Sequence, residues 1–339
     1  MDKDKLAVTA QAMMASGKGI LAADESTGTI KKRFEMIGVE NTEQARQSYR
    51  NLLFTSPGIE NHISGVIMFD ETIRQSTDDG VPFPAFLKSL GIEPGIKVDQ
   101  GAKDMEGHAG EKVTAGLDGL RQRLEEYAGM GLTFAKWRAV ITIGDGLPSG
   151  GCIADNADAL ASYANLCQAA GLVPIIEPEV LMEGSHTIDR CAEVTDRTLD
   201  MVFESLAAHR VYLPGIVLKP NMIISGIKCP QQADVSEVAA RTVELLKKRV
   251  PEHVPGIAFL SGGQTELSAT VHLQAINALG TEKPWALTFS YGRALQQGAL
   301  KSWRGNEAQL PDAQAAFLHR AKMNGAAAAG GYSAGLEAA

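Results

Sequence analysis

Cysteine is scarce in this chain of 339 residues, which contains only four. They lie far apart and form neither the close pairs that are typical of zinc sites nor the density of a disulfide framework. We therefore expect a protein of a reducing compartment, with the cytoplasm as the simplest location. The four residues are Cys152, Cys167, Cys191 and Cys229.

An excess of positive charge and long apolar runs are lacking as well. The chain has 32 Lys and Arg residues against 40 Asp and Glu residues, a formal net charge of -8. Nucleic acids and anionic membrane surfaces attract basic proteins, so neither is an expected partner. No apolar run approaches the roughly 20 residues that cross a bilayer. Leu6, Ala10 and Met13 have helical spacing, which indicates an amphipathic N-terminal helix rather than a targeting segment.

Short apolar runs alternate with longer segments of helical periodicity along the whole chain. Such alternation is typical of βα units around a parallel sheet, and eight runs suit a barrel better than a doubly wound sheet, which usually has fewer strands. We predict a single (β/α)8 barrel with extra helices over residues 1–325 and a flexible, Ala- and Gly-rich tail over 326–339. The expected strands are 19–23, 65–69, 95–98, 133–137, 173–176, 215–218, 256–260 and 285–289, and the clearest helices are 43–54, 114–128, 155–170, 187–208, 236–249, 265–279 and 293–303.

Charged residues gather at the carboxyl ends of these runs, where barrel enzymes collect their reactive groups. Lys136 and Arg138 lie two residues apart, as do Glu177 and Glu179, so each pair points to one face of its strand. If both pairs face the barrel, opposite charges meet at one mouth, because a buried charge is tolerable only with partners. The pattern indicates either acid–base machinery or a structural ion network.

Lys219 directly follows a fully apolar run and precedes Pro220, which ends the strand. A strand-end lysine taken alone is more often a solvated charge or an ion-pair partner. Burial beside another cation such as Lys136 would favour the neutral amine, the form that attacks a carbonyl. We therefore interpret Lys219 as a candidate Schiff-base lysine and Glu177 as the carboxylate that moves protons during carbon–carbon bond cleavage.

Two glycine-bearing runs predict phosphate binding. Residues 261–264 read Ser-Gly-Gly-Gln and residues 290–293 read Ser-Tyr-Gly-Arg, and each leads into a helix. Glycines let backbone N–H groups approach an oxyanion at a helix N-terminus, and barrels often bind phosphate after their seventh and eighth strands. Arg293 adds a bidentate donor.

These segments, taken in order, resemble those of the class I fructose-bisphosphate aldolases over about residues 5–325. The resemblance implies a (β/α)8 barrel that cleaves and forms fructose 1,6-bisphosphate without a cofactor or metal. It also implies a homo-oligomer, most simply a tetramer. The segments that carry it are 21–28 (LAADESTG), 134–138 (FAKWR), 177–179 (EPE), 218–222 (LKPNM), 259–264 (FLSGGQ) and 285–293 (WALTFSYGR).

The resemblance assigns a role to each charged residue at the mouth. Lys219 would form the Schiff base with the ketose C2, and Glu177 would be the main proton-transfer residue. Asp24 and Lys136 would assist bond cleavage and carbinolamine turnover, and Glu179 would orient the lysines. The C1 phosphate would bind to Ser261, Gly262, Gly292 and Arg293, while Lys97, Arg46, Ser26 and Arg138 would lie toward the C6 phosphate.

The tail departs from the pattern of these aldolases, which commonly end in a tyrosine implicated in protonating the enamine. This sequence ends Leu-Glu-Ala-Ala, and Tyr332 matches a position well before the terminal residue. We therefore leave Tyr332 out of the expected catalytic set and assign enamine protonation to Glu177 or water.

Three other functions fit parts of the pattern. A transaldolase or deoxyribose-phosphate aldolase would share the lysine, although the cations for two phosphates count against it. A non-catalytic scaffold would be expected to lose at least one reactive group. A metal-dependent aldolase needs grouped histidine ligands. None of the seven histidines falls at an expected strand end, and none has a His-x-His or His-x-x-x-His spacing, so this function is disfavoured. They are His62, His108, His186, His209, His253, His272 and His319.

Overall fold

A closed barrel of eight parallel strands forms the centre of the molecule. The computed structural model describes residues 1–338, so Ala339, the last residue of the predicted tail, lies outside the described part. In barrel order the strands are β1 (Gly19–Ala23), β10 (Ala286–Tyr291), β9 (Gly256–Phe259), β8 (Val217–Leu218), β7 (Val173–Val180), β6 (Phe134–Ile141), β3 (Glu93–Lys97) and β2 (Ile63–Met68).

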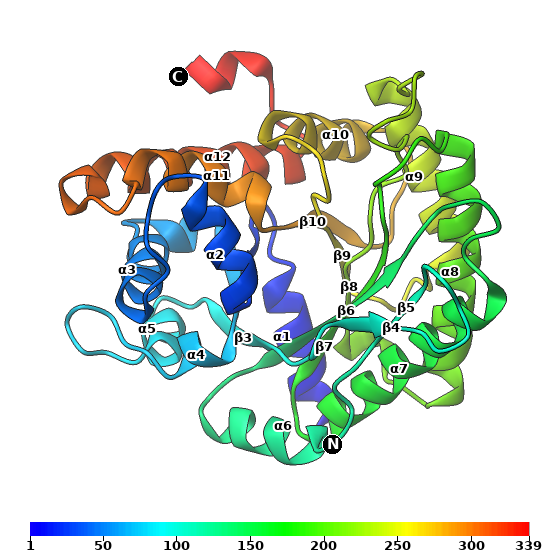
Figure 1. The fold of residues 1–339 in the computed structure, drawn as a ribbon, viewed down its shortest axis with the longest axis horizontal. Helices are drawn as coiled ribbons and strands as arrows, with labels where there is room; N and C mark the ends of the chain where they lie inside the picture. Colours follow the sequence, from blue (N-terminus) through cyan, green and yellow to red (C-terminus); the bar gives the residue numbers. More distant parts are fainter. Residues whose placement is uncertain (339) are drawn as a thin grey trace.

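Helices surround these strands on all sides (Figure 1). None of the described helices is long and apolar enough to span a bilayer. A separate antiparallel hairpin, β4 (Ala102–Asp104) with β5 (Lys112–Thr114), follows β3. The helices are α1 (Lys3–Met13), α2 (Thr27–Glu35), α3 (Glu43–Phe54), α4 (Asp70–Ile73), α5 (Phe83–Ser89), α6 (Leu120–Gly129), α7 (Gly150–Ala169), α8 (Ile188–Ala208), α9 (Val235–Arg249), α10 (Glu266–Ala278), α11 (Arg293–Trp303) and α12 (Leu310–Ala328).

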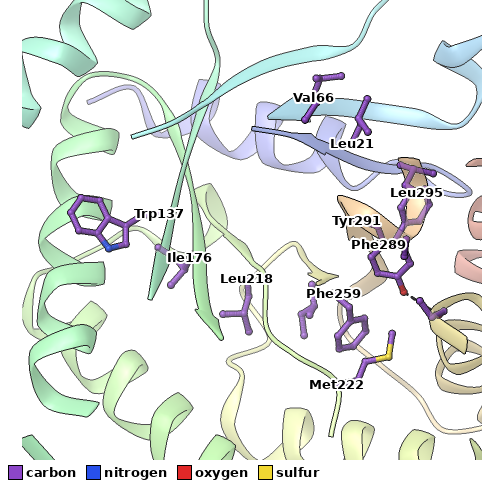
Figure 2. Packing of buried hydrophobic residues seen from close by; sticks show 14 of the residues in the cluster. Leu21, Val66, Trp137, Ile176, Leu218, Met222, Phe259, Phe289, Tyr291 and Leu295 are labelled. Atoms are coloured by element: carbon purple, nitrogen blue, oxygen red, sulfur yellow. Dashed lines mark hydrogen bonds between the residues drawn. The ribbon is translucent and has the colours of Figure 1, made fainter. Parts of the chain in front are cut away.

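Alternate residues of each strand face opposite sides, and the two sets form separate apolar cores. The outward set, which includes Leu21, Trp137, Ile176 and Leu218, packs beneath the helices (Figure 2). The inward set fills the barrel and includes Phe134, Val173, Ile175, Val217 and Ala258 together with Leu6, Ala10 and Met13 of α1. The amphipathic N-terminal helix predicted from the spacing is present as α1, and its apolar face packs against the barrel interior.

Each of the eight predicted runs overlaps a barrel strand, and the barrel fold is confirmed. Two strands continue well beyond their predicted ends: β6 continues to Ile141 and β7 to Val180, because their ladder extends through the pair Arg138–Glu177 and the pair Val140–Glu179. Arg138, Glu177 and Glu179 thus lie within strands rather than after them. The charged residues interrupt the apolar sequence but not the backbone pairing.

One helix begins later than the sequence indicated. The prediction placed a helix at 114–128, but α6 begins at Leu120. Residues 112–114 instead form β5, and Gly116 and Gly119 have φ values of 131° and 65°, in the region that side chains disfavour. The glycines allow the turn between the hairpin and the helix.

The predicted tail also begins too early. Helix α12 continues to Ala328, and Ala327 is fully buried. Alanine is the best helix former and its small side chain allows close packing, so an Ala-rich segment need not be mobile. Residues 334–338 form a short 3₁₀ helix beyond it.

Candidate functional site

The alternation of side chains that fills the barrel with apolar residues also places charged residues at its mouth. Ala22 is followed on the same face by Asp24, Phe134 by Lys136, Ile175 by Glu177 and Val217 by Lys219. These four charged side chains come from β1, β6, β7 and β8 or the residues just after them. All four are at most 12% exposed.

The four groups form one chain of ion pairs. Lys136 Nζ lies 2.7 Å from Asp24 Oδ2 and 3.1 Å from Glu177 Oε2. The other oxygen of the same carboxylate, Glu177 Oε1, lies 3.1 Å from Lys219 Nζ. Two lysines therefore share one carboxylate, and Lys219 has a proton acceptor in direct contact.

Burial and ion pairing oppose each other at these groups, and ion pairing prevails. Burial disfavours the charged form of Asp24, but Lys136 and Lys219 hold its pKa well below the ordinary value. Burial opposes the charge of Glu177 too, yet the same two lysines lower its pKa. Burial would lower the pKa of Lys136, but Asp24 and Glu177 raise it well above the usual range. Lys136 is thus a fixed cation between two ionised carboxylates.

Glu179, two residues further along β7, is in a different electrostatic environment. Burial raises its pKa even though Arg138 pairs with it through Nε. Its neighbour Arg138 is 42% exposed, so the pair reaches from the buried cluster toward solvent. Glu177 rather than Glu179 contacts the two lysines.

A cavity of about 280 Å³ lies over the cluster. Gly262 has a φ of 53° and Gly292 is the residue that precedes α11, so both expose backbone at the rim. Arg293 Nη2 donates to the carbonyl of Gly262 at 3.3 Å and links the two glycine segments. This arrangement fits an anion. Twelve of the thirteen predicted site residues line the cavity: Asp24, Ser26, Lys97, Lys136, Arg138, Glu177, Glu179, Lys219, Ser261, Gly262, Gly292 and Arg293.

A second cavity, of about 460 Å³, adjoins the first and shares Ser26, Lys97 and Arg138 with it. Lys97 Nζ is held by Asp99, at 2.7 Å from its Oδ1 and 2.8 Å from its main-chain carbonyl. In barrel order, β8, which Lys219 follows, lies between β10, which precedes Arg293, and β3, which ends at Lys97.

Arg46 is the predicted residue that the structure does not bring to either cavity. Its guanidinium makes two bonds to Glu71, at 2.6 and 2.7 Å, and a third to the Asn41 side chain. In this arrangement Arg46 holds α4, the short helix that follows β2, and its assignment to the C6 phosphate stays a prediction.

Six residues that line the cavity are not among the predicted site residues: Ala22, Glu25, Thr29, Arg33, Leu260 and Ser290. Arg33 lies on the same face of α2 as Thr29 and Ser26, a spacing that could have pointed to it once α2 was placed. The hydroxyl of Ser290 is buried without a hydrogen-bond partner among the described residues, which suits a ligand atom.

Tyr332 does not line the cavity. Its backbone N–H donates to Gln274 at 2.8 Å, and its hydroxyl donates to Glu337 at 2.9 Å. Glu337 is also paired with Arg320. The hydroxyl of Tyr332 therefore contacts Glu337, which Arg320 of α12 also holds, and its backbone is bonded to α10. The omission of Tyr332 from the catalytic set stays a prediction.

A buried amine beside a carboxylate, placed between two groups of cations in a barrel mouth, defines a class of enzyme that forms imines with sugar phosphates. The family model "Fructose-bisphosphate aldolase class-I" matches residues 5–339. A probable class 1 fructose-bisphosphate aldolase of Xanthomonas campestris pv. campestris is 57% identical over 97% of this chain and 99% of its own. The muscle-type aldolase of Lethenteron camtschaticum is 51% identical over 97% and 91%.

A solved structure agrees over nearly the whole chain. It is the fructose-bisphosphate aldolase of Plasmodium falciparum, in complex with TRAP and a small-molecule inhibitor, at 48% identity. The TM-score is 0.96, with 98% of this chain and 96% of that chain covered.

The chain thus belongs to the class I fructose-bisphosphate aldolases. It is a carbon–carbon lyase that reversibly cleaves fructose 1,6-bisphosphate to dihydroxyacetone phosphate and glyceraldehyde 3-phosphate through a lysine Schiff base, the general mechanism of the class. The predicted family and activity are confirmed.

The charge cluster predicts how stability depends on pH when Lys136 is replaced by Met. In the native chain the lowered pKa values of Asp24 and Glu177 stabilise the fold above pH ~4, and this stability is lost as pH falls through the folded values. Without Lys136, only Lys219 and Lys97 remain to oppose the burial that raises the pKa of Asp24, so we expect its ionisation to oppose folding. We expect a loss of about 3–5 kcal/mol at pH 7.5 and a smaller loss at pH 5.

Urea unfolding at the two pH values measures this difference. Lys31→Met is the matched control, because Lys31 pairs with Glu35 on the surface of α2 with both side chains about 60% exposed. The control should change stability by less than ~1 kcal/mol at either pH. If Lys136→Met lost the same free energy of unfolding at both pH values, or more at pH 5, the explanation of the charge cluster would be contradicted.

Proposed function

We propose that Lys219 is the lysine that forms the Schiff base and that Glu177 is its proton-transfer partner. The observation that carries this proposal is the 3.1 Å contact between Lys219 Nζ and Glu177 Oε1 in a buried cavity with cations on either side. Lys97 pairs with Asp99 and Arg138 pairs with Glu179, whereas Lys136 contacts the second oxygen of the Glu177 carboxylate. Lys219 contacts Glu177 directly after β8 ends, whereas Lys97 is held by Asp99 and Lys136 lies within β6 between two carboxylates.

The reaction follows from these contacts. Glu177 first accepts a proton from the Lys219 ammonium group, and the neutral amine attacks the ketose C2 carbonyl to give a carbinolamine. Glu177 then returns this proton to the carbinolamine hydroxyl, which leaves as water, and an iminium remains. A carboxylate, Glu177 or Asp24, takes the C4 hydroxyl proton while the electrons of the C3–C4 bond move into the iminium. The aldehyde departs and an enamine remains. Protonation at C3 and hydrolysis then release the ketone phosphate and restore the amine.

Lys136 and Glu179 support these steps without forming a covalent bond. Lys136 keeps Asp24 and Glu177 ionised, so each can accept a proton from substrate. Glu179 orients Arg138 at the cavity wall. Because Tyr332 is bonded to Glu337 away from the cavity, protonation of C3 is assigned to Glu177 or water.

The phosphates occupy the two cationic ends of the cavity. The C1 phosphate lies against the backbone of the glycine segments, where Ser261, Gly262, Gly292 and Arg293 converge. Arg33 and Ser290 join this set because they line the same cavity. The C6 phosphate lies toward Ser26, Lys97 and Arg138, which border both cavities.

Borohydride reduction in the presence of dihydroxyacetone phosphate should inactivate the enzyme irreversibly and add mass at Lys219. Reduction converts the iminium to a stable secondary amine, and peptide mass spectrometry locates it. Lys97 and Lys136 line the same cavity and serve as internal controls. Label on either of them in place of Lys219 would refute the assignment.

Replacing Glu177 by Gln should lower kcat by roughly 10²-fold or more, the scale of general acid–base catalysis. The trapped imine should still form at Lys219, although more slowly. A near-normal kcat would transfer the proton-transfer role to Asp24 or Glu179.

Arg293→Ala should raise KM for fructose 1,6-bisphosphate, because a charge-assisted contact to phosphate is removed. The expected loss of binding free energy is about 1.5–3 kcal/mol. Arg33→Ala should act in the same direction. Arg241→Ala is the control, since Arg241 pairs with Asp189 on the outside of α9 and should leave KM unchanged. An unaltered KM for both cavity variants would place the phosphate elsewhere.

We infer a cytoplasmic homotetramer, and both parts rest on similarity. The relative from Spinacia oleracea, 51% identical over 98% of this chain, is a cytoplasmic isozyme. The tetramer rests on the resemblance to class I aldolases. Light scattering of the purified protein should give about four times the mass of the chain, and a monomer mass at micromolar concentration would refute the tetramer.

A further inference from the structure

Gln296 occupies a fully internal position in the first turns of α11, four residues after the glycine that precedes the helix. It is 1% exposed. Its Nε2 donates to the carbonyl of Ala22 at 2.7 Å and to Glu25 Oε1 at 3.0 Å. Its Oε1 accepts a hydrogen bond from the Tyr49 hydroxyl at 3.1 Å. The amide thus has a partner for both N–H groups and for its oxygen.

The three hydrogen bonds together fix the orientation of the Gln296 amide. Ala22 and Glu25 present acceptors, and the Tyr49 hydroxyl presents a donor. Rotating the amide by 180° would place its oxygen against two acceptors and its N–H groups against a donor. The network therefore allows one orientation of Gln296, and it joins β1, α3 and α11.

Glu25 connects this amide to the cavity. Asp24 points to Lys136, whereas Glu25 contacts Arg33 and, at 2.7 Å, Arg50. Burial opposes the charge of Glu25, but Arg33 and Arg50 lower its pKa, so it remains a carboxylate. Two guanidinium groups and one amide share its two oxygens.

Arg33 reaches the proposed phosphate position at Gly292. A Cβ atom on Gly292 would lie 3.7 Å from an Arg33 terminal nitrogen and 3.3 Å from the Ala22 carbonyl oxygen. Gln296 is bonded to that same carbonyl and, through Glu25, to Arg33. The buried amide of Gln296 therefore contacts one neighbour of Gly292 directly and the other through the Glu25 carboxylate.

We propose that Gln296 is a positioning residue for the phosphate site, acting through Glu25 on Arg33. The proposal rests on the proposed role of Arg33 in binding phosphate. Glu25 supplies the charge that holds Arg33, and Gln296 fixes where the Glu25 carboxylate lies. The bond to Ala22 anchors the amide to the end of β1. Gln296 itself does not line the cavity and does not contact substrate.

Gln296→Met tests this role, because methionine has nearly the same length and no formal charge changes. Any altered affinity for anions then reports geometry rather than electrostatics. We expect KM for fructose 1,6-bisphosphate and the competitive Ki of inorganic phosphate to rise together by about 5- to 10-fold, with kcat changed by less than about threefold.

Tyr49→Phe is the matched control. It removes one hydrogen bond from the same amide on the side away from Glu25. It should lower the unfolding midpoint while KM and Ki stay within about twofold. If Gln296→Met does not fold, Gln296→Asn, which withdraws the amide by one methylene, is measured instead with the same expected direction.

A double-mutant cycle with Arg33→Ala separates positioning from general destabilisation. In the Arg33→Ala background, Gln296→Met should change Ki by less than about twofold, because the residue it positions is gone. An equal effect in both backgrounds, or a lowered midpoint with unchanged Ki, would overturn the proposal. If Arg33→Ala alone leaves KM and Ki unchanged, the phosphate role of Arg33 fails instead.

Discussion

The barrel mouth depends on a balance of buried charge. Lys136 and Lys219 face Asp24 and Glu177 with almost no access to solvent. An isolated charge in such a place would cost several kcal/mol, so each group is tolerable only because the others are present. The same balance leaves two carboxylates ionised beside an amine, which a carbonyl-condensing site requires. Stability and chemistry therefore depend on the same four side chains.

The two-residue period of the strands explains how much could be predicted. Lys136, Glu177 and Lys219 follow inward apolar residues at even spacing, so the sequence places them in the barrel mouth once the strands are known. Gly262 and Gly292 mark the rim because glycines before helices are local signals. The class of fold and the candidate roles of Lys219, Glu177 and Arg293 follow from patterns of this local kind, whereas most other site residues were assigned through the family resemblance.

Other features depend on contacts between distant segments. Arg46 looks like a free cation in the sequence, and only the fold brings it to Glu71. Glu25 appears beside Asp24, yet its partners lie on α2, α3 and α11. Residues 326–328 have the composition of a loose tail, but packing makes them the end of α12. Spacing within one segment carries no information about such partners.

The most direct test of the charge balance compares Lys136→Met with the double variant Lys136→Met/Asp24→Asn. In the single variant Asp24 has lost its nearest cation, whereas in the double variant no such carboxylate remains and Glu177 keeps Lys219. The account predicts that the double variant has the larger free energy of unfolding at pH 7.5, so that the second substitution restores stability. Additive losses, with the double variant less stable than the single one, would contradict it.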